Sequence, residues 1–338
     1  MPAKKWKYAL RALRSEVIDF RFDYPLEIVP EAGPKDSLEY YLYSERLAWD
    51  VMRLDPEGIP RAHARLMGEY YKPALAAWWG LVNLGHYLRH KDQSSLERFL
   101  IQINWLERNA IVRPDGAVVW PNNFDCLQGA TLLKAPWVSA YDQGLAISAL
   151  VRGWRISGRK ELRDLLTNSA RVFAMDVADN GVRISTEQGA LYTELPGSPP
   201  PGILDGFMTS LLGLYDLSVE LEDSEVEQLF MDGIRGLTST LPLWDYKGRW
   251  SWYGSRAYLS PPCYHQIHRS LLHVLAQLSG KATLADYAKR WDPRRLSAWE
   301  RSEIYLQFLV TKNAHRIKHR TWERSLDSVR IAVASKAA

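Results

Sequence analysis

Four segments of the chain are apolar around most of a helical turn and carry little charge at their centres. One of them contains ALAAWWGLVNLG, which begins at residue 74. A helix of this kind has no face suited to water and must be buried on several sides. The pattern predicts four such buried helices, within residues 70–90, 137–157, 201–220 and 264–280.

A second, more charged helix follows each buried one after a short polar or glycine-containing turn, which is the pattern of a helical hairpin. These amphipathic helices are expected within residues 92–109, 159–177, 223–241 and 281–293. The hairpins recur about every 65 residues, a weak internal repeat. Buried helices alternating with amphipathic ones predict an inner and an outer layer. We therefore expect a mainly α protein, a partial (α/α) toroid of about four helical hairpins.

Three long links separate the hairpins, at residues 109–136, 176–200 and 241–263. Their alternating polar and apolar residues predict short β-hairpins. Each link leads into an inner helix, so all three should meet at the same end of the toroid. Loops held on a rigid scaffold are a common place for function.

The ends of the chain follow different patterns. We expect residues 1–60 to form an N-terminal arm with irregular and strand-like segments. Residues 61–338 are expected to form the toroid, with further C-terminal helices and a basic tail.

Composition narrows the class of protein. With 338 residues, 46% of them hydrophobic, the chain can bury a large core, and its net charge of +4 is too diffuse to favour nucleic acid. Two cysteines, Cys126 and Cys263, do not support a disulfide framework. The N-terminus lacks the apolar core of a secretory signal, and no apolar run reaches the ~20 residues that span a bilayer. We expect a cytoplasmic protein that does not insert into membranes.

Several familiar motifs are absent from the sequence. It has no phosphate-binding glycine-rich loop, no GxSxG, no CxxC and no HExxH. His265 and His268 have a spacing that could hold a metal, but the sequence does not indicate a third ligand. We expect no metal and no cofactor.

Four blocks, in order, carry a resemblance to a known family. They are APWVSAYDQGLAISALVRGW (135–154), YTELPGSPPPGILDGFMTSLLGLYDL (192–217), LPLWDY (241–246) and YHQIH (264–268). Together they resemble the C-terminal domain of D-glucuronyl C5-epimerases, over roughly residues 60–290. Those enzymes convert D-glucuronate to L-iduronate in heparan-type polysaccharides. The resemblance implies that residues 61–338 are the catalytic domain of an isomerase, a homodimer that acts on an acidic, heparosan-like polysaccharide.

The resemblance also implies the catalytic residues. The family's catalytic tyrosine and arginine match Tyr253 and Arg256, and its second tyrosine matches Tyr264. A third family tyrosine follows a glutamate; here Glu194 is present, but Leu195 stands where the tyrosine would be. This departure leaves open whether the chain is active or whether all three tyrosines are needed.

The chemistry of epimerisation explains why tyrosine and arginine side chains are needed. It removes a proton next to a carboxylate and returns one to the opposite face of the sugar. Arg256 suits the carboxylate because its guanidinium can bind both oxygens. Tyr253 and Tyr264 are expected to be the acid and base, provided that a cation such as Arg256 favours a phenolate.

Further residues are expected to contact substrate. Tyr192 lies near the missing tyrosine, Gln143 lies on the second inner helix, and two tryptophans lie in the links at the proposed mouth. The expected substrate-binding residues are Tyr192, Gln143, Trp137, Trp244, His265 and His268. Structural roles are the alternative for each: tyrosines in aromatic loops are usually packing residues, and the histidines could cap a helix.

Three functions remain open at this stage. An epimerase would exchange the C5 proton with solvent. A polysaccharide lyase or glycoside hydrolase would cleave the polymer, and a lyase would also create a double bond. A glycan-binding protein that has lost activity would do neither, and Leu195 is the residue that favours it.

Overall fold

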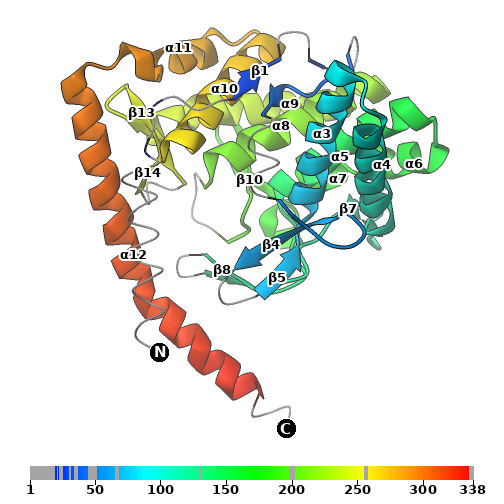
Figure 1. Ribbon diagram of the computed structural model, residues 1–338, viewed down its shortest axis with the longest axis horizontal. Helices are drawn as coiled ribbons and strands as arrows, with labels where there is room; N and C mark the ends of the chain where they lie inside the picture. The colour runs from blue at the N-terminus through cyan, green and yellow to red at the C-terminus, as the bar shows by residue number, and fades with distance from the viewer. Residues whose placement is uncertain are drawn as a thin grey trace.

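Four helical hairpins form the body of the computed structural model (Figure 1). The structure describes residues 20, 22, 26–29, 32–33, 37–44, 52–64, 68–128, 131–197, 202–254 and 258–334. The first helices of the hairpins are α3 (Pro73–His90), α5 (Ala140–Ser157), α8 (Leu204–Leu221) and α10 (Pro262–Ser279). Their partners are α4 (Gln93–Arg108), α6 (Lys160–Thr167) with the short α7 (Arg171–Ala174), α9 (Ser224–Thr240) and α11 (Ala282–Arg290). The prediction of a mainly helical protein is confirmed.

The first helices form a continuous inner row. α3 contacts α5, α5 contacts α8, and α8 contacts α10. Figure 1 shows the hairpins in sequence from α3 and α4 on one side to α10 and α11 on the other. The backbones of α5 and α8 come very close, because a Cβ atom on Gly144 would lie 2.5 Å from the Cα of Ser210. A side chain at Gly213 would similarly meet the backbone of α5.

Local signals explain where the helices begin and end. Each inner helix ends at a residue with positive φ, and two of these four residues are Gly158 and Gly280, where glycine makes the left-handed conformation inexpensive. Asp92 caps α4 and Asp223 caps α9 by accepting backbone N–H bonds. The outer helices bury one stripe each, as shown by Phe99 on α4.

The links carry short antiparallel hairpins. The strands of the first link are β6 (Ile111–Val112), β7 (Val118–Val119), β8 (Cys126–Gln128) and β9 (Thr131–Leu133). The second link contains β10 (Arg183–Thr186) and β11 (Gly189–Tyr192). The third contains a three-stranded sheet of β12 (Asp245–Tyr246), β13 (Trp250–Tyr253) and β14 (Tyr258–Leu259). Single 3-10 turns lie at Val177–Asp179, Leu241–Leu243 and Pro293–Arg295.

The described part of the N-terminal region is strand-like. Strands β1 (Glu27–Ile28) and β2 (Leu42–Tyr43) pair, and β3 (Arg53–Leu54), β4 (Pro60–Ala64) and β5 (Gly68–Tyr71) form a second sheet that leads into α3. β4 crosses the division expected at residue 60, so this sheet joins the arm to the helical body. The division into two domains stays a prediction.

The C-terminal helix α12 (Ala298–Ala334) runs along one edge of the molecule, and its C-terminal half extends past the other elements (Figure 1). Its inner face packs on β14 through Ile304 and Phe308. No helix in the described part of the chain is long and apolar enough to cross a membrane.

A buried ion pair ties the inner helices to the N-terminal region. Arg152 of α5 donates to Asp216 of α8 at 2.6 Å, and neither side chain is exposed to solvent. Arg152 also donates to the backbone carbonyls of Leu38 and Glu39, and the Tyr41 hydroxyl donates to Asp216 at 2.6 Å. This cluster stabilises the packing of residues 37–44 against α5 and α8.

Replacing Asp216 with asparagine should lower the free energy of unfolding by about 3 kcal/mol or more, because it leaves the Arg152 charge buried without its partner. Urea denaturation measures this. The matched control is Asp232→Asn, which removes the charge from partly exposed pairs with Arg183 and Arg235 and should change stability by less than about 1 kcal/mol. An equal loss of unfolding free energy in the two variants would show that the buried pair contributes no more to stability than a partly exposed one.

Candidate functional site

The first turns of the four inner helices meet at one end of the body. Lys72 precedes α3, Tyr141 lies in the first turn of α5, Asp205 in that of α8, and Tyr264 in that of α10. The Lys72 ammonium lies 5.0 Å from the centre of the Tyr141 ring. Tyr141 is close enough to Asp205 and Tyr264 for its ionisation to be coupled electrostatically to theirs. The links and helix starts therefore gather at one place, as the sequence predicted.

Tyr253 and Tyr264 are in direct contact. Their ring centres lie 4.8 Å apart in an edge-to-face arrangement, and Tyr258 stacks against Tyr253 at 5.1 Å. This distance leaves no room for a sugar between the two rings. A sugar that meets both hydroxyls has to approach the pair from its edge.

The surroundings keep these hydroxyls protonated. Burial raises the pKa of Tyr253 and of Tyr264 above the ordinary value of 10.0, and the nearby Asp205 carboxylate adds to the effect. Burial also raises the pKa of Tyr141, with Glu194 as the next cause. At neutral pH the three phenols are therefore proton donors.

Glu194 is a carboxyl group that titrates near neutral pH. It follows β11 and fits closely over Gly206 in the first turn of α8, where a Cβ atom would lie 2.1 Å from its Oε2. Burial raises the pKa of Glu194 to about 7, against the opposing effect of the Lys72 ammonium, whose Nζ lies 3.7 Å from Oε1. Such a group can both take up and release a proton at neutral pH.

Lys72 stays charged in this setting. Burial alone would lower its pKa, but the carboxylates of Asp142 and Glu194 outweigh burial and raise the pKa above its ordinary value. Asp142 is itself held in place, since it accepts bonds from the Ala74 backbone N–H at 2.8 Å and from the Asn122 amide at 2.7 Å. The site thus contains one fixed cation among several acidic groups.

A buried chain of polar groups lies beside Asp205. Its Oδ1 lies 3.5 Å from Nε2 of His268, and neither atom has a hydrogen-bond partner within the described residues. Nδ1 of His268 lies 2.8 Å from the hydroxyl of Ser251, which is 2.9 Å from Nδ1 of His265. Nε2 of His265 faces the carbonyl oxygen of Trp291 at 2.8 Å.

The positions of the protons follow from these contacts. A carbonyl oxygen only accepts, so His265 carries its proton on Nε2. If Ser251 donates to His268, the neutral His268 ring has its proton on Nε2, facing Asp205. If His268 donates to Ser251 instead, the neutral ring has no proton on Nε2. In either arrangement Nε2 faces the Asp205 carboxylate.

The residues expected to contact substrate are mostly buried. Gln143, Trp244, His265 and His268 have no exposed surface, Tyr192 has 1% and Trp137 has 7%. Their polar atoms bond within the protein: Tyr192 donates to the Leu229 carbonyl, Gln143 to the carbonyls of Val118 and Ser169, Trp137 to that of Phe124, and Trp244 to that of Gly202. This placement favours a role in holding the links over direct contact with substrate.

Two of the predicted positions need separate mention. Arg256 lies outside the described residues. Leu195 packs in an apolar cluster with Leu133, Trp137 and Ile203, against which Tyr253 is also packed. Leu195, which stands where the resemblance places a tyrosine, thus belongs to the apolar cluster against which Tyr253 packs.

A groove of about 540 Å³ lies close to this cluster. Tyr70, Tyr71, Trp105 and Phe124 supply its aromatic lining, and Asp55, Glu57, Glu69, Arg108, Asn109 and Asn123 supply polar groups. Phe124 also packs against Trp137 in the cluster that contains Tyr253. Phe124 thus lines the groove and also contacts the apolar cluster against which Tyr253 packs.

Sequence reasoning missed Lys72, Tyr141 and Asp205. Their signal was positional, because each stands at the start of an inner helix and the inner helices start at the same end. Among the described residues, no three histidine, cysteine or carboxylate side chains are grouped as metal ligands would be.

Comparison with known proteins gives two kinds of match. Residues 115–293, more than half of the chain, match the family model described as D-glucuronyl C5-epimerase C-terminus. The D-glucuronyl C5-epimerase of Caenorhabditis elegans is 28% identical over 221 residues, which cover 60% of this chain and 35% of the relative. An uncharacterized protein of Methanocaldococcus jannaschii is 22% identical over 219 residues, 60% of this chain and 70% of that protein. The chain spans about a third of the length of the worm protein.

The stability of the protein should depend on pH through Glu194. Its pKa is higher in the folded protein, about 7, than the ordinary 4.5 of an unfolded chain, so its contribution to stability is complete below 4.5 and is lost as pH rises through 7. A shift of this size corresponds to about 3 kcal/mol. Glu194→Gln cannot titrate, so its free energy of unfolding should gain up to about 3 kcal/mol relative to wild type between pH 4.5 and 8.5.

Urea denaturation of both proteins at several pH values measures this difference. Glu187→Gln, an exposed position in the same hairpin, is the control. A constant difference between Glu194→Gln and wild type across this range would mean that Glu194 ionises at its ordinary pKa.

Proposed function

Because this chain belongs to the D-glucuronyl C5-epimerase family, we propose that it inverts C5 of D-glucuronate residues in an acidic, heparosan-like polysaccharide. The observation that carries the proposal is the meeting of two protonated tyrosines, a carboxyl group with a pKa of about 7 and a lysine ammonium around the starts of the inner helices. Proton removal beside a carboxylate needs a proton acceptor, a proton donor and a cation, and this cluster contains all three types of group.

Tyr253 and Tyr264 are assigned as the acid/base pair. In the resting state both are protonated, which suits the return of a proton to C5. Removal of the C5 proton needs a phenolate or another acceptor, and Glu194 is the neighbouring group whose pKa of about 7 lets it accept a proton at neutral pH. The nearby Asp205 carboxylate favours the protonated phenols.

The substrate carboxylate is proposed to bind to positively charged side chains. Arg256 is expected to bind it through two oxygens, and Lys72 is the described cation beside the cluster. Neutralising the carboxylate lets it take up the charge of the carbanion at C5.

The arrangement of the body fits a polymer substrate. The aromatic groove, which shares Phe124 with the apolar cluster beside Tyr253, offers ring faces on which sugars stack and polar groups for their hydroxyls. We also propose that the four hairpins form part of an (α/α) toroid whose link-bearing end is the active site, and that the protein acts in the cytoplasm without a cofactor.

A glycan-binding function without catalysis is the second candidate, and Leu195 is the observation that favours it. The family tyrosine at this position is replaced by a buried apolar side chain. The experiments that test the epimerase also distinguish it from a glycan-binding protein and from a lyase.

Replacing Tyr253 or Tyr264 with phenylalanine should lower the rate of deuterium exchange at C5 by about 10²-fold or more, the usual scale for a general acid–base group. Exchange into heparosan-like polymer in D₂O, followed by NMR, measures the rate. Tyr87→Phe, near the C-terminal end of α3 and away from the helix starts, is the control and should keep full activity.

The outcomes separate the candidate functions. Exchange without a new double bond identifies the epimerase, whereas ultraviolet absorbance from unsaturated sugar identifies a lyase. Binding of polymer by the wild type without exchange identifies the glycan-binding protein. Undiminished exchange in both phenylalanine variants would remove these tyrosines from the mechanism.

Arg256→Lys should lose at least about 10-fold in kcat/KM, since lysine keeps the charge but cannot bind the carboxylate through two parallel hydrogen bonds. Steady-state kinetics on the polymer measure the loss. Lys72→Arg, which keeps a charge beside Glu194, is the comparison. Full activity of Arg256→Lys would show that two-point binding at this position is not required.

A further inference from the structure

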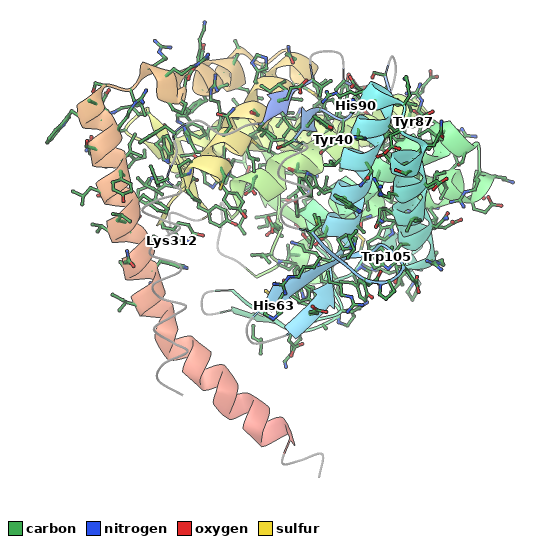
Figure 2. The ribbon with its side chains drawn as sticks, viewed as in Figure 1. Tyr40, His63, Tyr87, His90, Trp105 and Lys312 are labelled. Atoms are coloured by element: carbon green, nitrogen blue, oxygen red, sulfur yellow. The ribbon has the colours of Figure 1, made fainter. Side chains whose placement is uncertain are left out.

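The tyrosine pair forms one side of the space around the helix starts. Tyr253 and Tyr264 touch edge to face, so a sugar cannot stand between their rings. The far side of the pair is filled, because Tyr258 stacks on Tyr253, and Lys312, labelled in Figure 2, lies over the Tyr258 ring at 3.4 Å. A sugar that meets both hydroxyls therefore has the whole pair on one side of it.

Inversion at C5 needs a group on the other side as well. The proton leaves one face of the sugar ring and a proton returns to the other face, so a second donor or acceptor has to lie opposite the pair. The row of inner helices shows where that place is. Helix α8 contacts both α5 and α10, and packed helices lie about 8–10 Å apart. Tyr264 stands in the first turn of α10, so the place across α8 from it is the first turn of α5.

Tyr141 occupies this place. It lies in the first turn of α5, and Asp205, in the first turn of α8, stands between it and Tyr264 along the row. The ionisation of Tyr141 is coupled electrostatically to that of Tyr264. The two phenols are therefore near enough to act on one sugar, and they come from helices on either side of α8.

The Tyr141 hydroxyl is available to a substrate. Its ring is only partly buried, and within the described residues its hydroxyl makes no hydrogen bond. Tyrosines with a structural role in this protein differ in both respects. The buried Tyr41 donates to Asp216, and the buried Tyr192 donates to the Leu229 carbonyl. A phenol whose hydroxyl has no partner in the protein is suited to a contact with substrate.

The structure also brings Tyr141 beside the position of the missing family tyrosine. The Ala140 backbone N–H donates to the Thr193 carbonyl at 3.0 Å. This bond joins the start of α5 to the segment that contains Glu194 and Leu195. Leu195 itself is buried in the apolar cluster. A phenol from α5 thus lies next to the place where the resemblance expects one from the link.

We propose that Tyr141 is a catalytic residue, which transfers a proton to C5 on the face of the sugar opposite the tyrosine pair. This role rests on the epimerase activity proposed above. Tyr264 serves the other face, with Tyr253 against it. The Lys72 ammonium, 5.0 Å from the centre of the Tyr141 ring, stabilises the phenolate that Tyr141 becomes when it gives up its proton.

The protons balance without a further reactant. Tyr264 gives its proton to Glu194, and the resulting phenolate takes the C5 proton of D-glucuronate, while the electron pair of that bond stays with C5 and its carboxyl group. Tyr141 breaks its O–H bond and forms the new C–H bond of L-iduronate. Glu194 then returns its proton to the Tyr141 phenolate. Glu194 suits this task because it is coupled electrostatically to both tyrosines and has a pKa of about 7.

Deuterium exchange measured separately from each epimer tests the role of Tyr141. In D₂O, Tyr141→Phe should still exchange the C5 proton of D-glucuronate in heparosan-like polymer, because the face served by Tyr264 is intact. It should lose at least about 10²-fold in conversion to L-iduronate and in exchange from polymer that contains L-iduronate. Tyr264→Phe should show the reverse, with exchange kept only from L-iduronate. NMR of the C5 position measures each rate.

Tyr87→Phe is the matched control. Figure 2 shows Tyr87 near the end of α3 that lies away from β5 and the helix starts, so this variant should keep inversion and both exchange reactions. Tyr141→Phe should also keep the near-ultraviolet circular dichroism spectrum of the wild type and its affinity for heparosan-like polymer. Loss of that spectrum would show that the hydroxyl supports the fold, and would overturn the proposal.

The remaining outcomes separate this role from the proposed function. Full inversion by Tyr141→Phe would overturn the role of Tyr141, and so would an equal loss of exchange from both epimers, which a purely structural role predicts. In both cases the wild type still inverts C5, and the proposed function stands. A wild type that exchanges neither epimer refutes the proposed function and the role of Tyr141 together.

Discussion

The contact between α5 and α8 is the constraint on which the candidate site depends. Gly144 and Gly213 let the two backbones approach more closely than side chains would allow. This closeness sets where the first turns of the helices lie, and therefore where Tyr141 and Asp205 lie relative to each other. The Arg152–Asp216 pair joins the same two helices further along, so the geometry of the site is fixed from behind by packing and by a buried charge pair.

The chemistry of the site comes from placing several acidic groups and one cation where water is scarce. In water, a glutamate is ionised at neutral pH and a tyrosine is a weak acid. Here burial and the repulsion between neighbouring carboxylates raise the pKa of Glu194 to about 7. Burial and the Asp205 carboxylate raise the pKa of Tyr253 and of Tyr264, so both stay protonated. Nε2 of His268 lies beside the Asp205 carboxylate at 3.5 Å.

Most of the helical fold could be predicted from the sequence. The buried helices are apolar on several faces and their partners are amphipathic, and these patterns depend only on local sequence. The site was predicted in part. Tyr253 and Tyr264 lie together. Lys72 lies outside the four family blocks, and Asp205 lies inside one of them without a role that the sequence could assign; both enter the site through the packing of four helix starts. The burial of Gln143 and Tyr192 could not be read from the sequence either, because a polar residue on an inner helix or in a link can face the cleft or the backbone of a neighbouring link.

The tight fit of Glu194 over Gly206 has a consequence for comparing related chains. A residue larger than glycine at that helical position would overlap the Glu194 side chain, which would have to move. A single small residue in a helix, with no chemistry of its own, thus lets the carboxyl group take its present place beside Lys72. It offers a simple marker for sorting related proteins that have space for a carboxyl group at this place from those that do not.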